Sequence, residues 1–466
     1  MSDAPESTTD DSRSVPLREV LARLAGASRG FWLVNAVNFG DGIAYFGFLS
    51  LLTLFFQHDV GMDAGGATIA TSTFTGLVTL FMVLGAGALS DRLGARRALT
   101  ASMAVVLFGR VVLTLSPSLG AGTGAAFAAA WLAILVMGFA EGAVQPALYA
   151  GVKQYTDERT ASMGYAFLYS IMNLGIFLGE MVSPFVRDWF ARTFEGVSVA
   201  EVPTAGITGS FWFFTGVTAL VLLVNLVFFT KNVEARDRVD SPATLDPQPE
   251  RIAPASSLLE RLRSLPILDA RFLFFIFALL PVRTLFAHQW LTIPDYVTRA
   301  FPAEVGSRVE WIQGLNPIVI VFAVPALTAL TRKVHVVDVM ILGTLVSAAA
   351  TFLLSAPPSL TLLIAYVVIF TLGEAIWSSR FLEHVANLAP AGRLGVYMGL
   401  AGLPWFLAKT VTGFYAGSML ETFLPAEGPQ APGTMWTIHG AIAMLSPVAL
   451  VLGRRWMKAP ATKETR

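Results

Sequence analysis

Long apolar runs, separated by short polar segments, dominate the pattern along the chain. Each run has about 20 residues or more, which is the length that an α-helix needs to cross the hydrocarbon core of a bilayer. The strands of a membrane barrel would instead alternate in polarity over segments of about ten residues, whereas these runs are continuous. The pattern predicts about twelve spanning helices, at residues 31–56, 66–90, 97–116, 123–152, 160–186, 210–230, 271–298, 309–331, 335–355, 359–387, 395–420 and 436–455.

A polar interval divides these spans into two groups of six. Residues 232–270 begin with a stretch rich in charge and proline and continue with 256–268, which we expect to form a short amphipathic helix. The resulting organisation has five parts. They are a cytoplasmic N-terminal segment (1–30), an N-terminal six-helix bundle (31–231), a cytoplasmic linker (232–270), a C-terminal six-helix bundle (271–456) and a cytoplasmic tail (457–466).

The composition indicates that most of the surface contacts lipid. Apolar residues make up 55% of the 466 and charged residues only 14%, whereas about a quarter is typical of soluble chains. Because every backbone polar group must be paired in lipid, the predicted fold class is an all-α membrane protein. The absence of cysteine excludes disulfides and thiolate metal sites, and the formal net charge of zero suggests no nucleic-acid partner.

Lysine and arginine gather in alternate loops, and such loops face the cytoplasm. With the N-terminus inside, the opposite side collects only Arg187, Arg192, Arg299 and Arg308. We expect a multi-pass protein of the cell inner (plasma) membrane with both termini in the cytoplasm. Residues 1–30 lack an apolar core of signal-peptide type, so the first span is predicted to serve as an uncleaved targeting signal. Arg187 and Asp188 are predicted to lie at the membrane interface.

The loop between the second and third spans, residues 87–97, reads GALSDRLGARR. It resembles the signature loop of the major facilitator superfamily, GxLaDrxGxRR. The resemblance implies a major facilitator fold of 12 transmembrane helices in two six-helix halves, and a gating role for this loop. An alternative is that a basic cytoplasmic loop matches this signature by chance. The corresponding loop of the second half, residues 331–335, keeps little of the signature. The gating candidates are Gly87, Asp91, Arg92, Gly94, Arg96 and Arg97.

Four further segments resemble the proton-dependent oligopeptide transporter family. Residues 313–320, 372–390 and 398–407 resemble its QxxNPxxI, LGExxxSPxGL…KLAP and MMGxWFL segments, and 168–175 resembles its FYxxINxG. The first span departs from that family's ExxERFxYYG, because Asn38 and Gly42 replace an acid and the Arg while Asp41 keeps one carboxylate. In the fourth span, Gln145 replaces the family's Lys before Pro. The linker also has no room for the two extra helices of many bacterial members.

A charged side chain inside a bilayer is costly, so each one is a candidate for function. The candidates for proton coupling are Glu374, Asp41, Glu141 and His288. The resemblance implies that Glu374 recognises a substrate amine, and the alternative is a structural salt bridge to Arg283 or Lys409. For Glu141 the alternative is a buried pair with Arg110, and for His288 it is an ordinary hydrogen bond.

Polar and amphipathic groups on the spans expected to face the cavity are the candidates for substrate binding. Tyrosine and tryptophan are also common at membrane interfaces, and asparagine and glutamine also bond helices together. The candidates are Tyr45, Gln145, Tyr169, Asn173, Arg283, Gln289, Gln313, Asn316, Glu374 and Trp405.

These features favour a secondary active transporter that resembles the oligopeptide family. We expect proton-coupled symport of small peptides or a related small polar or zwitterionic solute, by alternating access at a site between spans one, four, seven and ten. Two alternatives are a proton-coupled drug or metabolite exporter on the same scaffold, and a non-transporting sensor or scaffold. No nucleotide-binding, metallopeptidase or nucleophile motif occurs in a credible context, so we expect neither an enzyme nor a cofactor nor a metal. The expected partners are the substrate, protons and lipid, and the expected state is a monomer.

Overall fold

The computed structural model describes residues 26–84, 93–156, 161–239, 270–331, 334–388 and 400–458. Within these ranges the chain folds into helices joined by short connections, with no strand. Several sequence predictions lie outside the described residues. They concern residues 1–25, Gly87, Asp91 and Arg92 of the signature loop, the amphipathic helix at 256–268, and residues 397–399.

The first group of spans forms six long helices. They are α2 (Arg29–His58), α3 (Ala64–Leu84), α5 (Ala95–Leu115), α6 (Gly124–Tyr155), α7 (Ala161–Phe190) and α8 (Ile207–Phe228). Three shorter elements extend them: a 3-10 turn η1 (Ser116–Leu119), a π-helical turn η2 (Ala191–Glu195) and the helix α9 (Lys231–Asp237). Polar caps set two of the starts, because the hydroxyls of Ser28 and Thr123 accept hydrogen bonds from the backbone amides three residues later, those of Phe31 and Ala126.

The second group contains more breaks. It comprises α11 (Ala270–Ala278), α12 (Leu280–Leu291), α13 (Ile293–Ala300), α14 (Ala303–Gly306), α15 (Val309–Thr331), α16 (Val336–Ala350), the 3-10 turn η5 (Thr351–Ser355), α17 (Leu360–Leu388), α19 (Leu403–Phe423) and α20 (Pro432–Lys458). The single predicted span 271–298 is thus divided into α11, α12 and α13. Pro281 and Pro294 lie in the first turns of α12 and α13, where a residue without an N–H is tolerated.

Eleven helical segments among the described residues are long and apolar enough to cross a membrane. The twelfth, α19, has a similar length of 21 residues but a more polar sequence that includes Lys409, and it packs along α3. Large apolar side chains such as Phe322 and Leu452 are exposed, while the charged side chains of Arg110 and Glu310 are buried. This inverted polarity is expected when the outer surface contacts lipid. The predicted all-α fold of twelve long helices is confirmed.

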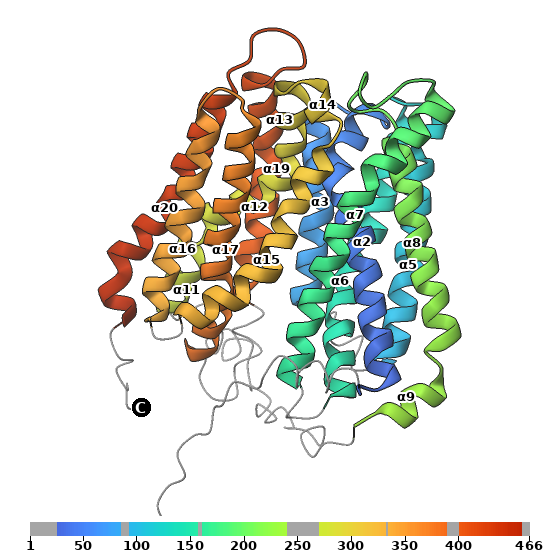
Figure 1. Ribbon diagram of the computed structural model, residues 1–466, viewed down its shortest axis with the longest axis vertical. Helices are drawn as coiled ribbons and strands as arrows, with labels where there is room; N and C mark the ends of the chain where they lie inside the picture. The colour runs from blue at the N-terminus through green and yellow to red at the C-terminus, as the bar shows by residue number, and fades with distance from the viewer. Residues whose placement is uncertain are drawn as a thin grey trace, which may run out of the picture.

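The two groups of helices form two bundles that lie side by side (Figure 1). We call the bundle of α2 to α8 the first half and the bundle of α11 to α20 the second half. The halves meet where α3 packs on α19 and α7 packs on α15, and where α12 contacts α2 and α3. We call the end of the molecule at α14 (top of Figure 1) the α14 end, and the end at α9 (bottom) the α9 end.

Candidate functional site

A cavity of about 230 Å³ lies between the two halves. The first half contributes residues from α2 and α7, and the second half contributes residues from α12, α15, α17 and α19. The lining residues are Tyr45, Phe46, Leu49, Tyr169, Met172, Asn173, Ile176, Phe286, Gln289, Trp290, Gln313, Asn316, Pro317, Ile320, Glu374, Trp405 and Lys409.

The structure brings most of the predicted binding residues to this cavity. Those that line it are Tyr45, Tyr169, Asn173, Gln289, Gln313, Asn316, Glu374 and Trp405. Two predicted residues lie elsewhere. The amide Nε2 of Gln145 lies 3.8 Å from the sulfur of Met172, behind the cavity wall, and Arg283 lies behind Trp405.

Sequence reasoning missed the apolar part of the lining. Phe286 lies three residues before the predicted Gln289, Met172 three residues after Tyr169 and Ile176 three residues after Asn173. Residues three and four apart lie together on one helix face, so helical spacing was the signal that could have found these side chains. The same spacing then leads from Phe286 to Trp290, four residues later.

Glu374 provides a carboxylate in the cavity wall, and Asn316 of α15 orients it. The Asn316 amide Nδ2 donates to Glu374 Oε2 at 2.9 Å and lies at the same distance from Thr371 Oγ1. Among the described residues, no cation forms an ion pair with Glu374, so the salt bridge considered to Arg283 or Lys409 is not formed here. The carboxylate remains available to a ligand cation.

Lys409 provides a cation in the same cavity. Its Nζ donates to Thr79 Oγ1 of α3 at 2.9 Å, and the Thr79 hydroxyl in turn donates to the carbonyl of Thr75. This hydrogen bond joins the two halves. Between described residues, no other hydrogen bond or ion pair across the halves lies closer to the α9 end.

Arg110 of α5 gathers two of the predicted proton-coupling residues outside the cavity. Its Nη2 lies 2.5 Å from Glu141 Oε1 of α6 and 3.8 Å from Asp41 Oδ1 of α2. The same guanidinium donates to the Thr218 hydroxyl of α8. We call Asp41, Arg110, Glu141 and Thr218 the Arg110 cluster. It connects four helices of the first half, and Asp41 lies one helical turn from the cavity residue Tyr45.

His288 and Arg283, both on α12, point away from the cavity into the second half. His288 bonds Thr292 Oγ1 at 2.8 Å and the Tyr415 hydroxyl at 3.0 Å, and its ring centroid lies 3.9 Å from that of His439. The Arg283 guanidinium packs over three aromatic rings, with Phe381 at 4.3 Å and Trp405 at 4.8 Å from its central carbon. Such cation–π contacts partly replace a counter-ion.

The described part of the signature loop contacts α9. Gly94 has a φ of +77° and precedes the first turn of α5, a conformation that favours glycine. Arg96 Nε lies 2.7 Å from Glu234 Oε2 of α9. Asp237 of α9 accepts from the Gly30 amide at 2.8 Å. Partial burial of the Asp237 carboxylate raises its pKa, but the hydrogen bonds from Arg236 and from the Gly30 amide outweigh this effect. The net result is a lowered pKa of Asp237.

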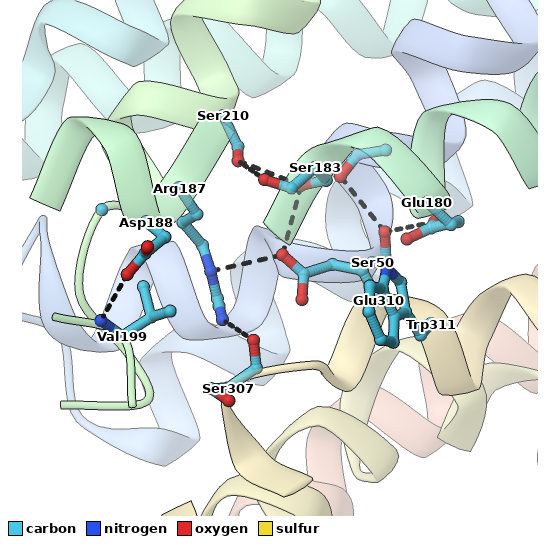
Figure 2. Close-up of polar contacts among 12 residues, drawn as sticks. Ser50, Glu180, Ser183, Arg187, Asp188, Val199, Ser210, Ser307, Glu310 and Trp311 are labelled. Atoms are coloured by element: carbon cyan, nitrogen blue, oxygen red, sulfur yellow. Dashed lines mark hydrogen bonds and ion pairs between the residues drawn. The ribbon is translucent and has the colours of Figure 1, made fainter. Parts of the chain in front are cut away.

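Buried polar contacts close the α14 end between the halves (Figure 2). Arg187 of α7 lies 3.3 Å from Glu310 of α15, measured from Nε to Oε1, and its Nη2 donates to the Ser307 carbonyl at 2.8 Å. Ser183 of α7 donates to the same Glu310 oxygen at 3.2 Å. We call Ser183, Arg187, Ser307 and Glu310 the Arg187 cluster. Arg187, which was predicted to lie at the membrane interface, forms this ion pair inside the protein, where Arg187 and Glu310 are both fully buried. Its neighbour Asp188 pairs with exposed Arg192.

A second set of contacts closes the same end between α2 and α13. Asp295 and Arg299 of α13 form an ion pair with 2.6 Å between Oδ1 and Nη2. Gln57 of α2 donates to Asp295 Oδ2 at 2.9 Å and accepts from Arg299 Nη2 at 2.5 Å. Thr53, one turn earlier, donates to the carbonyl of the cavity residue Trp290 at 2.8 Å. Two sets of contacts across the halves therefore lie at the α14 end: the Arg187 cluster between α7 and α15, and the contacts of Gln57 with Asp295 and Arg299 between α2 and α13.

Comparisons with known sequences place these observations in a family. The profile of the Major Facilitator Superfamily matches residues 34–408. The dipeptide and tripeptide permease A of Yersinia pestis is 22% identical over 476 residues, which cover 91% of this chain and 89% of the permease. The dipeptide and tripeptide permease A of Cronobacter turicensis is 25% identical over 209 residues, which cover 44% of this chain and 37% of that permease.

Solved structures share the same arrangement of helices. A peptide transporter POT in complex with sulfate has a TM-score of 0.71 at 17% identity, covering 95% of this chain and 99% of that one. A POT family transporter in complex with 5-aminolevulinic acid has a TM-score of 0.67 at 15% identity, covering 93% and 97%. The nucleoside transporter NupG (D323A mutant) has a TM-score of 0.69 at 13% identity, covering 92% and 100%. The predicted major facilitator fold is confirmed.

Proposed function

The chain belongs to the Major Facilitator Superfamily, and from this premise we propose that it is a secondary active transporter that carries small peptides or a related zwitterionic solute together with protons. Its resemblance to peptide transporters supports this class of solute, because its curated relatives are dipeptide and tripeptide permeases. One solved neighbour binds 5-aminolevulinic acid, a compact molecule that also carries an amine and a carboxylate. Transport of such a solute is consistent with a cavity between two halves that contains both a carboxylate and an ammonium, Glu374 and Lys409.

The carboxylate of Glu374 is the observation that carries the proposal. It lies in the cavity wall and Asn316 holds it in place. Among the described residues it has no ion-pair partner, and an intramembrane charge in that condition marks a site for substrate or ion. A ligand ammonium would supply the missing counter-charge when it binds, and a proton would supply it when the site is empty. Glu374 can thereby couple substrate binding to proton binding.

The Arg110 cluster supports proton coupling in the first half. Two carboxyl groups, of Asp41 and Glu141, lie beside a single guanidinium. If both were ionised, the cluster would carry a net negative charge within the bilayer, and one proton neutralises it. We propose that the cluster takes up and releases that proton as the first half moves, because Asp41 lies on the same helix as the cavity residue Tyr45.

The contacts at the α14 end support alternating access. With the N-terminus in the cytoplasm, the α14 end faces the outside, and the structure then represents a state closed to the outside by the Arg187 cluster and by Gln57, Asp295 and Arg299. Opening of the cavity to the outside requires these contacts to separate and contacts near the α9 end to form. The hydrogen bond from Lys409 to Thr79 already joins the halves in the present state, and further contacts between α3 and the second half would add to it.

Uptake into proteoliposomes tests the proposal. Radiolabelled dialanine and 5-aminolevulinic acid are offered outside vesicles that contain the full chain, with an imposed pH gradient, acid outside. We expect accumulation that a protonophore abolishes, and a loss of about tenfold or more in Glu374→Gln, since a charged hydrogen bond contributes about 1.5–3 kcal/mol. Exposed Glu304→Gln is the control. Transport only outward would favour the exporter, and binding without flux would favour the sensor.

A further inference from the structure

Among the described residues, the first half contributes no charged side chain to the cavity lining. Its lining side chains are Tyr45, Phe46, Leu49, Tyr169, Met172, Asn173 and Ile176. The backbone prevents a charged side chain at Gly42, because a Cβ placed there would lie 2.6 Å from the Met172 carbonyl oxygen. The two buried arginines in the described part of this half are already paired, Arg110 with Glu141 and Asp41, and Arg187 with Glu310.

The second half presents both a cation and an anion. Lys409 of α19 and Glu374 of α17 line the same cavity, but they do not form an ion pair with each other. The partner of Lys409 is the neutral Thr79 hydroxyl, whereas an ammonium has three N–H donors. An ammonium without a carboxylate is costly inside a membrane, which indicates that an anionic ligand completes this site.

We propose that Lys409 binds the carboxylate of the zwitterionic substrate whose ammonium binds Glu374, so that both charged groups of the substrate bind the second half. This inference rests on the proposed function and assigns the anion-binding residue. The substrate class is accordingly a compact molecule whose amine and carboxylate reach two helices of one half. The first half contacts its uncharged part through Tyr45, Tyr169 and Asn173.

The position of Lys409 connects ligand binding to the relative movement of the halves. Its ammonium holds Thr79 of α3 when no anion is present. A substrate carboxylate competes for the same ammonium and weakens this hydrogen bond across the halves. Binding therefore acts on a contact near the α9 end, and Arg283, which sequence reasoning considered for the carboxylate, stays among aromatic rings behind Trp405.

Matched ligands and variants test this assignment on the purified full chain. Affinity is measured by calorimetry for dialanine and for its C-terminal amide, which lacks the carboxylate. In the wild type we expect amidation to weaken binding by about tenfold or more. In Lys409→Gln, which can still donate to Thr79, we expect dialanine to bind as weakly as the amide does. Lys409→Arg, which keeps the charge, should restore most of the discrimination and shows that the site tolerates substitution.

Three other outcomes would overturn the inference. If Lys409→Gln keeps the full wild-type discrimination against the amide, the carboxylate binds elsewhere. If Arg283→Gln abolishes that discrimination while Lys409→Gln does not, Arg283 is the anion site. If the wild type binds neither dialanine, 5-aminolevulinic acid nor free amino acids, the proposed function itself fails, and the inference fails with it. The first two outcomes leave the proposed function standing.

Discussion

The Arg110 cluster and the Arg187 cluster use the same chemistry in different places. Each contains a fully buried arginine next to a buried glutamate and a serine or threonine hydroxyl. The Arg110 cluster joins α2, α5, α6 and α8, all in the first half. The Arg187 cluster joins α7 of the first half to Ser307 and Glu310 of the second. Under the proposed mechanism, the first cluster keeps its helices together and the second must open.

The geometry of the two clusters agrees with this division. In the Arg110 cluster the ion-pair distance from Arg110 Nη2 to Glu141 is 2.5 Å, and a second carboxylate, that of Asp41, lies 3.8 Å from the same nitrogen. In the Arg187 cluster the ion-pair distance is 3.3 Å, and the shortest bond goes to a backbone carbonyl. Buried ion pairs contribute little net stability, but loss of one partner is strongly destabilising. A looser pair with a neutral second partner separates more easily.

The largest expected effect follows from removal of the cation of the Arg110 cluster. Arg110→Gln leaves Asp41 and Glu141 buried without a guanidinium, and we expect a loss of about 3–5 kcal/mol in stability. Thermal melting of the protein in nanodiscs, at one scan rate, measures it. Glu141→Gln should cost much less, since Asp41 remains as an anionic partner. Equal melting temperatures for Arg110→Gln and the wild type would contradict a structural role of the cluster in the first half.

A smaller effect on stability, but a larger one on conformation, is expected at the Arg187 cluster. Glu310→Gln keeps the bond from Arg187 to Ser307 but removes the ion pair across the halves, so the α14 end should open more often. The chain has no cysteine, so Gln313→Cys reports access to the cavity through its labelling rate with a membrane-impermeant maleimide.

We expect faster labelling from the α14 side by about tenfold if the change in closure is about 1.4 kcal/mol. The matched control is exposed Glu304→Gln, which removes a carboxylate outside both clusters and should leave the labelling rate unchanged. The same acceleration in both variants would show that opening does not depend on the ion pair of the Arg187 cluster.

The fold was predictable because apolar runs of spanning length and a single polar interval are properties of the sequence itself. One detail was not predictable in the same way. The division of the seventh span depends on where Pro281 and Pro294 fall relative to helix starts.

The site was predictable where a polar residue lay on a recognisable motif, as for Glu374 and Asn316. The arrangement of charges in the site was not predictable, since the sequence does not show that α17 and α19 bring Glu374 and Lys409 to the same cavity without an ion pair between them. Arg187 was placed at the membrane interface because it lies close to a span end. Its burial depends on Glu310, which follows more than a hundred residues later and forms the pair only in the folded molecule.

The smallest expected effect concerns Asp59, which caps α2 near Arg187 and Glu195 at the α14 end. Burial and the negative charge of Glu195 raise its pKa to about 7, although Thr208 and Arg187 oppose the shift. The folded state then binds a proton more tightly than the unfolded state, so the contribution of Asp59 to stability is favourable below about pH 4 and is lost as pH rises through about 7.

Asp59→Asn removes this pH dependence of stability. We expect it to raise stability above pH 7 by about 1–2 kcal/mol, which is less than the full pKa shift implies because water reaches the carboxylate. Melting temperatures on both sides of pH 7 measure the difference, with exposed Glu304→Gln as the control. An unchanged pH dependence in Asp59→Asn would mean that the Arg187 cluster is not flanked by a titrating group, and that its opening is governed by its ion pair alone.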